Sequence, residues 1–103
     1  GSLGFIGSSL RLKLSKSQDV HGADIINKIQ ENYTNVEKPE VFINLIKNNK
    51  FDLIINSSGS ANVQFSFNSP HEDYNLNVNN VFLHLNSINQ FSNKTKYLLL
   101  SLL

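Results

Sequence analysis

Glycines recur every three residues at the start of the chain, where Gly1, Gly4 and Gly7 frame the apolar pair Phe5-Ile6. Such glycines allow a tight turn and let the backbone approach a pyrophosphate, and the N-terminus of a following helix attracts the anion. A flexible glycine tail is the alternative, because this spacing alone is a weak signal. The apolar pair favours a folded loop, since a flexible linker needs no apolar anchors.

An acidic residue follows at the distance that a ribose-binding carboxylate requires. Asp24 ends a predicted strand and lies 23 residues after Gly1, against the roughly 20 residues expected in dinucleotide-binding domains. Its carboxylate would accept hydrogen bonds from the adenosine ribose and would repel a 2′-phosphate. The alternative is a surface turn residue. Together with the glycines, Asp24 favours NAD over NADP.

The hydrophobic pattern predicts the elements that would position these residues. Ile6, Leu10 and Leu14 recur at helical spacing, although residues 10–14 also alternate as a strand would. The glycine loop favours the helix. The predicted order is a helix over 5–15, a strand over 19–24, a helix from 39 that ends within 47–50, a strand over 51–56, a helix over 75–91 and a strand over 96–101, with no element in the polar stretch 27–38.

Alternating helices and strands predict an α/β fold with right-handed crossovers. We expect a Rossmann-like parallel sheet with helices on both faces, incomplete because its first strand and its C-terminal part are missing. The apolar runs 51–56 and 96–101 predict strands that are buried within this sheet. Residues 1–103 would form a partial NAD-binding domain, with the substrate domain absent. A flavodoxin-like domain, in which the glycines have no role, is the alternative.

Composition narrows the classes of partner and site. Nine basic residues against eight acidic ones give a net charge of +1, which argues against a nucleic-acid or membrane surface as the main partner. The chain has no cysteine, which excludes disulfides and thiolate chemistry and fits a cytoplasmic location. Its histidines, His21, His71 and His84, lack the spacing of metal ligands, so we expect no metal site.

Several segments resemble one family in register. The segment "GSLGFIGSSL" resembles the opening of the extended short-chain dehydrogenase/reductase superfamily, in particular the NAD-dependent nucleotide-sugar epimerases and dehydratases. The segment "DVHGAD" is similar to their second strand, and "FDLIINSSGSANV" to their fourth strand and its loop. Further along, "SFNSPHEDYNLNV" and "KYLLLS" are similar to the next helix start and the next strand.

The resemblance implies a set of NAD-binding residues. Asp24 would bind the adenosine ribose, and Asn77 would support the loop that crosses the middle of the cofactor. The residues expected to surround the pyrophosphate are Gly1, Gly4, Phe5, Ile6 and Gly7, and those expected in the crossing loop are Ser57, Ser58 and Gly59. The implied reaction is the transient oxidation of a nucleotide sugar by hydride transfer to NAD, in an enzyme that forms a homodimer through residues 75–91.

The sequence departs from the family at its catalytic positions. The family uses a Y-x-x-x-K pair as general acid and base, and no tyrosine of this chain has a lysine at that spacing. Ser101 matches the first serine of the family's strand end, but Leu102 stands where the catalytic Ser or Thr is expected. No residue is therefore assigned a catalytic role, and this chain alone is expected to be inactive. The alternatives are a non-catalytic nucleotide-binding or scaffold member of the same fold, or an inactive truncated fragment.

Overall fold

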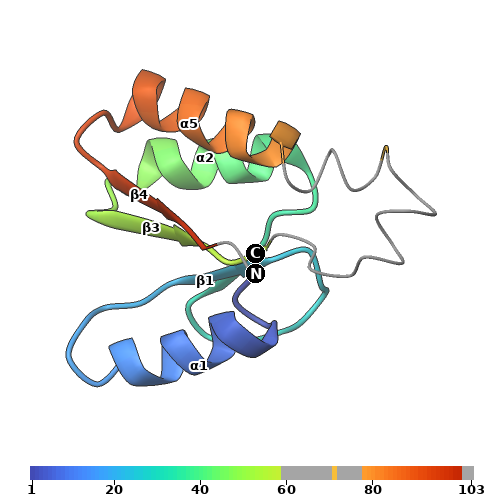
Figure 1. Ribbon diagram of the computed structural model, residues 1–103, viewed down its shortest axis with the longest axis vertical. Helices are drawn as coiled ribbons and strands as arrows, with labels where there is room; N and C mark the ends of the chain where they lie inside the picture. The colour runs from blue at the N-terminus through green and yellow to red at the C-terminus, as the bar shows by residue number, and fades with distance from the viewer. Residues whose placement is uncertain (59–70, 72–77, 101–103) are drawn as a thin grey trace.

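The computed structural model describes residues 1–58, 71 and 78–100. Helices and short strands alternate along the chain (Figure 1). The elements are α1 (Phe5–Leu14), β1 (Gly22–Asp24), β2 (Tyr33–Asn35), α2 (Pro39–Asn48), β3 (Leu53–Asn56), α5 (Asn80–Phe91) and β4 (Lys96–Leu99). The expected α/β class is confirmed. Among the described residues, every helix is too short or too polar to cross a membrane.

The strands form two separate parallel pairs. β1 pairs with β2, which places Asp24 opposite Asn35, and β3 pairs with β4, which places Asn56 opposite Leu99. No ladder joins the two pairs in the described part of the chain. Figure 1 shows α2 and α5 side by side over β3 and β4, whereas α1 lies on the other side, next to β1. The molecule therefore has helices on both sides of its strands.

The N-terminal segment forms a helix, as the glycine loop predicts, and not the alternating strand. Gly4 has an extended conformation (φ −74°, ψ 174°) immediately before α1, and Arg11 and Lys13 lie in its last turn. Basic side chains at this end interact favourably with the negative end of the helix dipole. The buried residue of α1 is Gly7, so this helix packs closely against the chain beneath its first turn.

The apolar core lies between α2 and α5. Pro39 begins α2, where its missing N–H costs nothing, and Glu40 complements the dipole in the first turn. Phe42 and Ile46 project from α2 and are 6% and 2% exposed, and Ile88 of α5 is 7% exposed. These side chains hold the helical layer together above β3 and β4.

Two predictions about strands are wrong. Residues 27–38 do contain a strand, β2, in which Tyr33 and Thr34 favour strand structure but the run of three residues is too short to show a strand pattern. It forms because β1 offers a partner, with hydrogen bonds from Gly22 N to Asn32 O (2.7 Å) and from Val36 N to Asp24 O (2.9 Å) at its ends.

The apolar strands are also less buried than predicted. Leu53 of β3 is 49% exposed, and Leu98 and Leu99 of β4 are each 47% exposed. Each of these strands has one neighbour among the described strands, so neither has the cover that a central strand receives.

Candidate functional site

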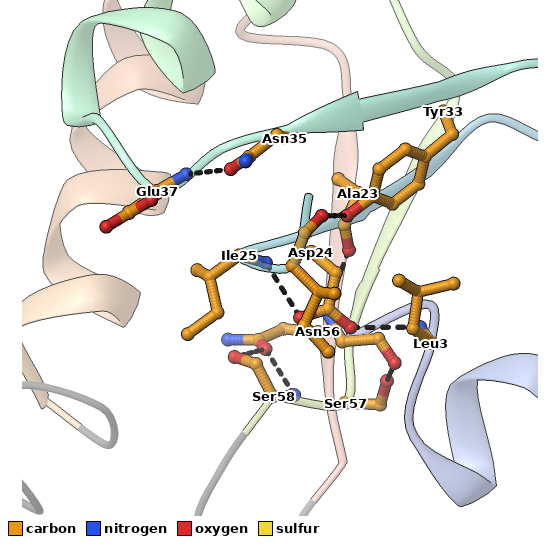
Figure 2. Close-up of polar contacts among 12 residues, drawn as sticks. Leu3, Ala23, Asp24, Ile25, Tyr33, Asn35, Glu37, Asn56, Ser57 and Ser58 are labelled. Atoms are coloured by element: carbon orange, nitrogen blue, oxygen red, sulfur yellow. Dashed lines mark hydrogen bonds and ion pairs between the residues drawn. The ribbon is translucent and has the colours of Figure 1, made fainter. Parts of the chain in front are cut away.

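The carboxyl ends of β1 and β3 meet the glycine loop. The Gly1 nitrogen donates to the Ala23 carbonyl oxygen at 2.8 Å, and the Ser2 nitrogen donates to the same oxygen at 3.0 Å. From the other side, the Ser57 hydroxyl donates to the Gly1 carbonyl oxygen at 3.2 Å (Figure 2). The first two residues of the loop are therefore held between the two strand ends.

The loop is compact and its glycines differ in what they require. Gly4 N donates to Gly1 O at 3.2 Å, and Ser8 N donates to Gly4 O at 2.9 Å. A Cβ on Gly7 would overlap the Gly1 carbonyl, and one on Gly1 would lie 2.7 Å from Ser57 Oγ. A Cβ on Gly4 would lie 3.4 Å from its nearest neighbour. Gly1 and Gly7 are therefore needed for close approach, whereas Gly4 is not.

The N-terminus of α1 is open to an anion. No side chain among the described residues caps the helix, and its first turn contains no acidic residue. The helix dipole places partial positive charge here, and the first amide groups have no partner within the helix. The Phe5 side chain is 92% exposed, so the prediction that it anchors the loop is wrong. Ile6 is half-buried and Gly7 is buried, and they hold the first turn in place.

Asp24 connects the loop to the end of β1. Its Oδ2 accepts a hydrogen bond from Leu3 N at 2.9 Å, and its Oδ1 accepts one from Ile25 N at 2.7 Å (Figure 2). The Gly1 amino nitrogen lies 3.7 Å from Oδ2. Burial lowers the pKa of this amino group, and the Asp24 carboxylate acts in the opposite direction. Each carboxylate oxygen has a second lone pair, so Asp24 keeps acceptor positions for a ligand hydroxyl.

A pocket of about 380 Å³ lies beside the loop, between α1 and the segment that connects β1 to β2. Arg11 lines it and donates to Gln30 Oε1 (2.9 Å) and to the carbonyl oxygens of Glu31 and Asn32 (2.8 Å each). The guanidinium therefore fixes the segment between β1 and β2 to α1. The Ser2 hydroxyl, which also lines the pocket, is buried without a hydrogen-bond partner among the described residues.

A chain of polar side chains lies behind the loop that follows β3. Asn56, 5% exposed, accepts through Oδ1 from Ser58 N (2.9 Å) and Ser58 Oγ (2.5 Å). Its Nδ2 donates to Tyr97 OH at 2.8 Å, and Tyr97 OH lies 2.8 Å from His84 Nδ1. The His84 ring stacks on Phe42 with 4.3 Å between centroids. This series of hydrogen-bonded side chains connects β3, β4 and α5.

Burial controls the protonation states of His84 and Tyr97 in this series of hydrogen bonds. Burial, with a smaller contribution from the Gly1 amino group, lowers the pKa of His84 to about 4. Burial also raises the pKa of Tyr97, opposed by its hydrogen bond with Asn56. Both rings are therefore neutral near pH 7. Their chemistry is that of hydrogen bonding, not of charge.

The structure brings together most of the residues predicted for the site. Gly1, Gly4, Gly7 and Asp24 lie in one cluster with the loop after β3, which includes Ser57 and Ser58. Gly59 and Asn77, and also Ser101 and Leu102, lie outside the described residues.

Sequence reasoning missed the connection from Ser58 through Asn56 and Tyr97 to His84. Its members are far apart in the chain, and spacing gave no signal for it. In the part of the chain that the structure describes, no three metal-ligating side chains form a group that could hold an ion.

Comparison with known proteins adds no relative. A scan against protein-family models, a search of curated proteins and a search of solved structures each returned no match for this chain.

Proposed function

We propose that this chain is the NAD-binding part of a Rossmann-type domain. The observation that carries the proposal is the meeting of an uncapped helix N-terminus, a close-packed glycine loop and a strand-end carboxylate in one place. The residues present fit a dinucleotide, because the absence of a Cβ at Gly1 and Gly7 lets the loop pack tightly between the end of β3 and the start of α1. The amide groups at the start of α1 would bind the pyrophosphate, and Asp24 would bind the adenosine ribose.

The arrangement of the strands supports the same proposal. β1 and β3 each have one neighbour among the described strands, and their carboxyl ends are linked through Gly1 and Ser57. A doubly wound sheet places a central parallel strand between two such pairs, and its dinucleotide binds where the strand order reverses. We infer that the space between β1 and β3 is the place of that central strand.

The charges near the loop favour NAD over NADP. The Asp24 carboxylate would repel a 2′-phosphate at the adenosine ribose, and the nearby Arg11 guanidinium is already engaged by three oxygen acceptors. Lys28 lines the same pocket as Arg11, and its flexible, exposed side chain is a weaker recognition element than a fixed guanidinium.

The resemblance to nucleotide-sugar epimerases and dehydratases suggests the reaction. NAD, when bound, supplies a hydride acceptor for a sugar carbon, and the residues of this chain bind and orient that cofactor. We assign no catalytic residue among them. The full enzyme would take a nucleotide sugar as substrate and form a homodimer through the α5 helix. A non-catalytic nucleotide-binding member of the same fold is the second candidate, which the replacement of the expected catalytic hydroxyl by Leu102 favours.

Calorimetric titration with NAD and NADP tests the proposal. We expect NAD to bind more tightly than NADP, and Asp24→Asn to weaken NAD binding about tenfold, because hydrogen bonds to a charged group are lost. Asp19→Asn is the matched control, since Asp19 is exposed and lies outside the cluster. If the chain gives a folded circular dichroism spectrum and no heat with millimolar NAD, the dinucleotide proposal is wrong.

A further inference from the structure

The hydrogen bonds behind the loop after β3 run in one direction. The direction is fixed by a backbone group, because Ser58 N–H can only donate and Asn56 Oδ1 receives it at 2.9 Å. Asn56 Nδ2 must then face Tyr97 OH, to which it donates at 2.8 Å. The Ser58 hydroxyl also faces Asn56 Oδ1. Since an amide oxygen has no hydrogen to give, Ser58 is the donor in that contact.

The same reasoning sets the far end of the chain. The Tyr97 oxygen receives a hydrogen from Asn56, so its own hydrogen needs an acceptor. His84 Nδ1, 2.8 Å away, is that acceptor if the neutral imidazole carries its proton on Nε2. Stacking on Phe42 keeps the His84 ring in this orientation. Every donor from Ser58 to His84 therefore points toward α5, away from the glycine loop.

We propose that His84, Tyr97 and Asn56 are positioning residues that hold the Ser58 hydroxyl as a hydrogen-bond acceptor for a ligand. The inference rests on the proposed function, because it assigns Ser58 a part in the same dinucleotide site. With its hydrogen committed to Asn56, Ser58 Oγ has only lone pairs to offer. It suits a neutral donor, such as a ribose hydroxyl or the carboxamide NH₂ of nicotinamide, and it does not suit a phosphate oxygen.

This polarity complements the other half of the site. The N-terminus of α1 presents N–H donors that no side chain in the described part of the molecule caps, and such donors recognise phosphate. Ser57, the neighbour of Ser58, binds the Gly1 carbonyl, so the acceptor and donor halves are joined through the loop. A ligand with an anion at one end and hydroxyl or amide donors further along matches both halves, and free phosphate matches only one.

The first experiment reads the tautomer of His84 without any ligand. Nitrogen-15 correlation spectra of the imidazole rings should show His84 with hydrogen on Nε2 and with Nδ1 unprotonated at pH 7. Tyr97→Phe should abolish this preference and speed hydrogen exchange of the Ser58 amide. If His84 of the unmodified protein carried its proton on Nδ1, the proposed direction of these hydrogen bonds would be wrong.

The second experiment measures dissociation constants for NAD and for ADP-ribose, which lacks the nicotinamide. Ser58→Ala should weaken binding about threefold to tenfold, the effect of one neutral hydrogen bond, and Ser58→Thr should restore it. Loss with both ligands assigns the donor to a ribose hydroxyl, and loss with NAD alone assigns it to the carboxamide. His84→Gln, whose amide oxygen can accept from Tyr97, should bind within about twofold of the unmodified chain, and His84→Leu should resemble Ser58→Ala.

The outcomes separate the two proposals. Normal NAD binding that Ser58→Ala leaves unchanged overturns the role of Ser58 and leaves the dinucleotide site standing. A folded chain that binds neither NAD nor ADP-ribose overturns the proposed function and the ligand role of Ser58 together. Equal losses in His84→Gln and His84→Leu would show that His84 acts through packing and not by accepting a hydrogen bond.

Discussion

At the scale of single residues, two glycines of the same loop have opposite tolerance for a side chain. Gly7 lies against the Gly1 carbonyl, where a Cβ would overlap it, whereas Gly4 has open space out to 3.4 Å. Among the described residues no glycine has a positive φ. Space, and not backbone freedom, is therefore what makes Gly7 necessary.

Serine substitutions at these two positions should have opposite effects. Gly7→Ser should cost about 1–3 kcal/mol of unfolding free energy, because the new Cβ must displace the Gly1 carbonyl. Gly4→Ser should be neutral or stabilise by roughly a few tenths of a kcal/mol, since serine is a slightly better N-cap than glycine. Urea denaturation of both variants measures the difference. Equal stability of the two variants would mean that the loop does not close as the structure has it.

Asn32 shows the other kind of backbone requirement. It has a positive φ of 52°, and its carbonyl oxygen accepts from both Gly22 N and Arg11. Asparagine and glycine tolerate this conformation better than other residues do. We expect Asn32→Ala to destabilise the chain by about 1 kcal/mol and Asn32→Gly to have a smaller effect. Thermal unfolding of the pair distinguishes them, and an Asn32→Gly variant that loses more than Asn32→Ala contradicts the explanation.

At the scale of elements, the packing of α5 over β4 buries His84 and so makes the stability of the fold depend on pH. The pKa of His84 is about 4 in the folded chain, against 6.5 for an exposed histidine. Between these two values the unfolded chain binds a proton that the folded chain does not. Stability is therefore full above pH 6.5, falls as the pH drops toward 4, and changes no further with this group below it. The total loss from His84 is about 3 kcal/mol.

Comparing His84→Gln with the unmodified chain isolates this effect. Glutamine does not titrate, so the difference between the two unfolding free energies should change by about 3 kcal/mol between pH 7 and pH 4. Other histidines contribute equally to both proteins and cancel in the comparison. A difference that stays constant over this range would mean that His84 is not buried as a neutral ring.

Elements with local signals could be predicted, and those that depend on distant partners could not. Pro39 and the spacing of Phe42 and Ile46 locate α2 from its own sequence. The strand β2 is harder to predict, because its three residues are too few to show a strand pattern, although Tyr33 and Thr34 favour strands. It is stabilised by pairing with β1 and by the hydrogen bonds of Arg11 to the residues before it.

The candidate site divides in the same way. Gly7 and Asp24 could be located from spacing, since Gly7 continues the glycine repeat at the start of the chain and Asp24 ends β1. The connection from Ser58 to His84 could not be predicted. Asn56 and Tyr97 are 41 positions apart, and Tyr97 and His84 are 13 apart. Only the packing of β3, β4 and α5 brings these side chains into contact.

At the scale of the whole molecule, a small core is combined with a large apolar surface. Phe42, Ile46 and Ile88 are the buried hydrophobic residues of the described chain, whereas many large apolar side chains are about half exposed or more. β1 and β3 also present an edge without a strand in the described part of the chain. Such surfaces are usually covered by another element or another chain. The described part of the molecule therefore exposes apolar surface and strand edges that are suited to association.

The helix α5 offers one such surface for the proposed homodimer. Phe82 and Leu85 of α5 are 72% and 48% exposed, and Val78, which precedes the first residue of α5, is 46% exposed. The spacing of Phe82 and Leu85 places both on one face of α5. If the chain pairs through this face, Phe82→Asp should raise the dimer dissociation constant at least about tenfold, because a charge would have to be buried.

Sedimentation equilibrium measures this association. Leu12→Asp is the matched control, since Leu12 is 71% exposed but lies on α1, on the other side of the strands from α5 (Figure 1). A dimer that Phe82→Asp dissociates and Leu12→Asp leaves intact would place the interface on α5. A dimer weakened only by Leu12→Asp would place it on the α1 side instead. An unmodified protein that remains monomeric at high concentration would contradict pairing through either helix, because Phe82 and Leu12 would then stay exposed to solvent.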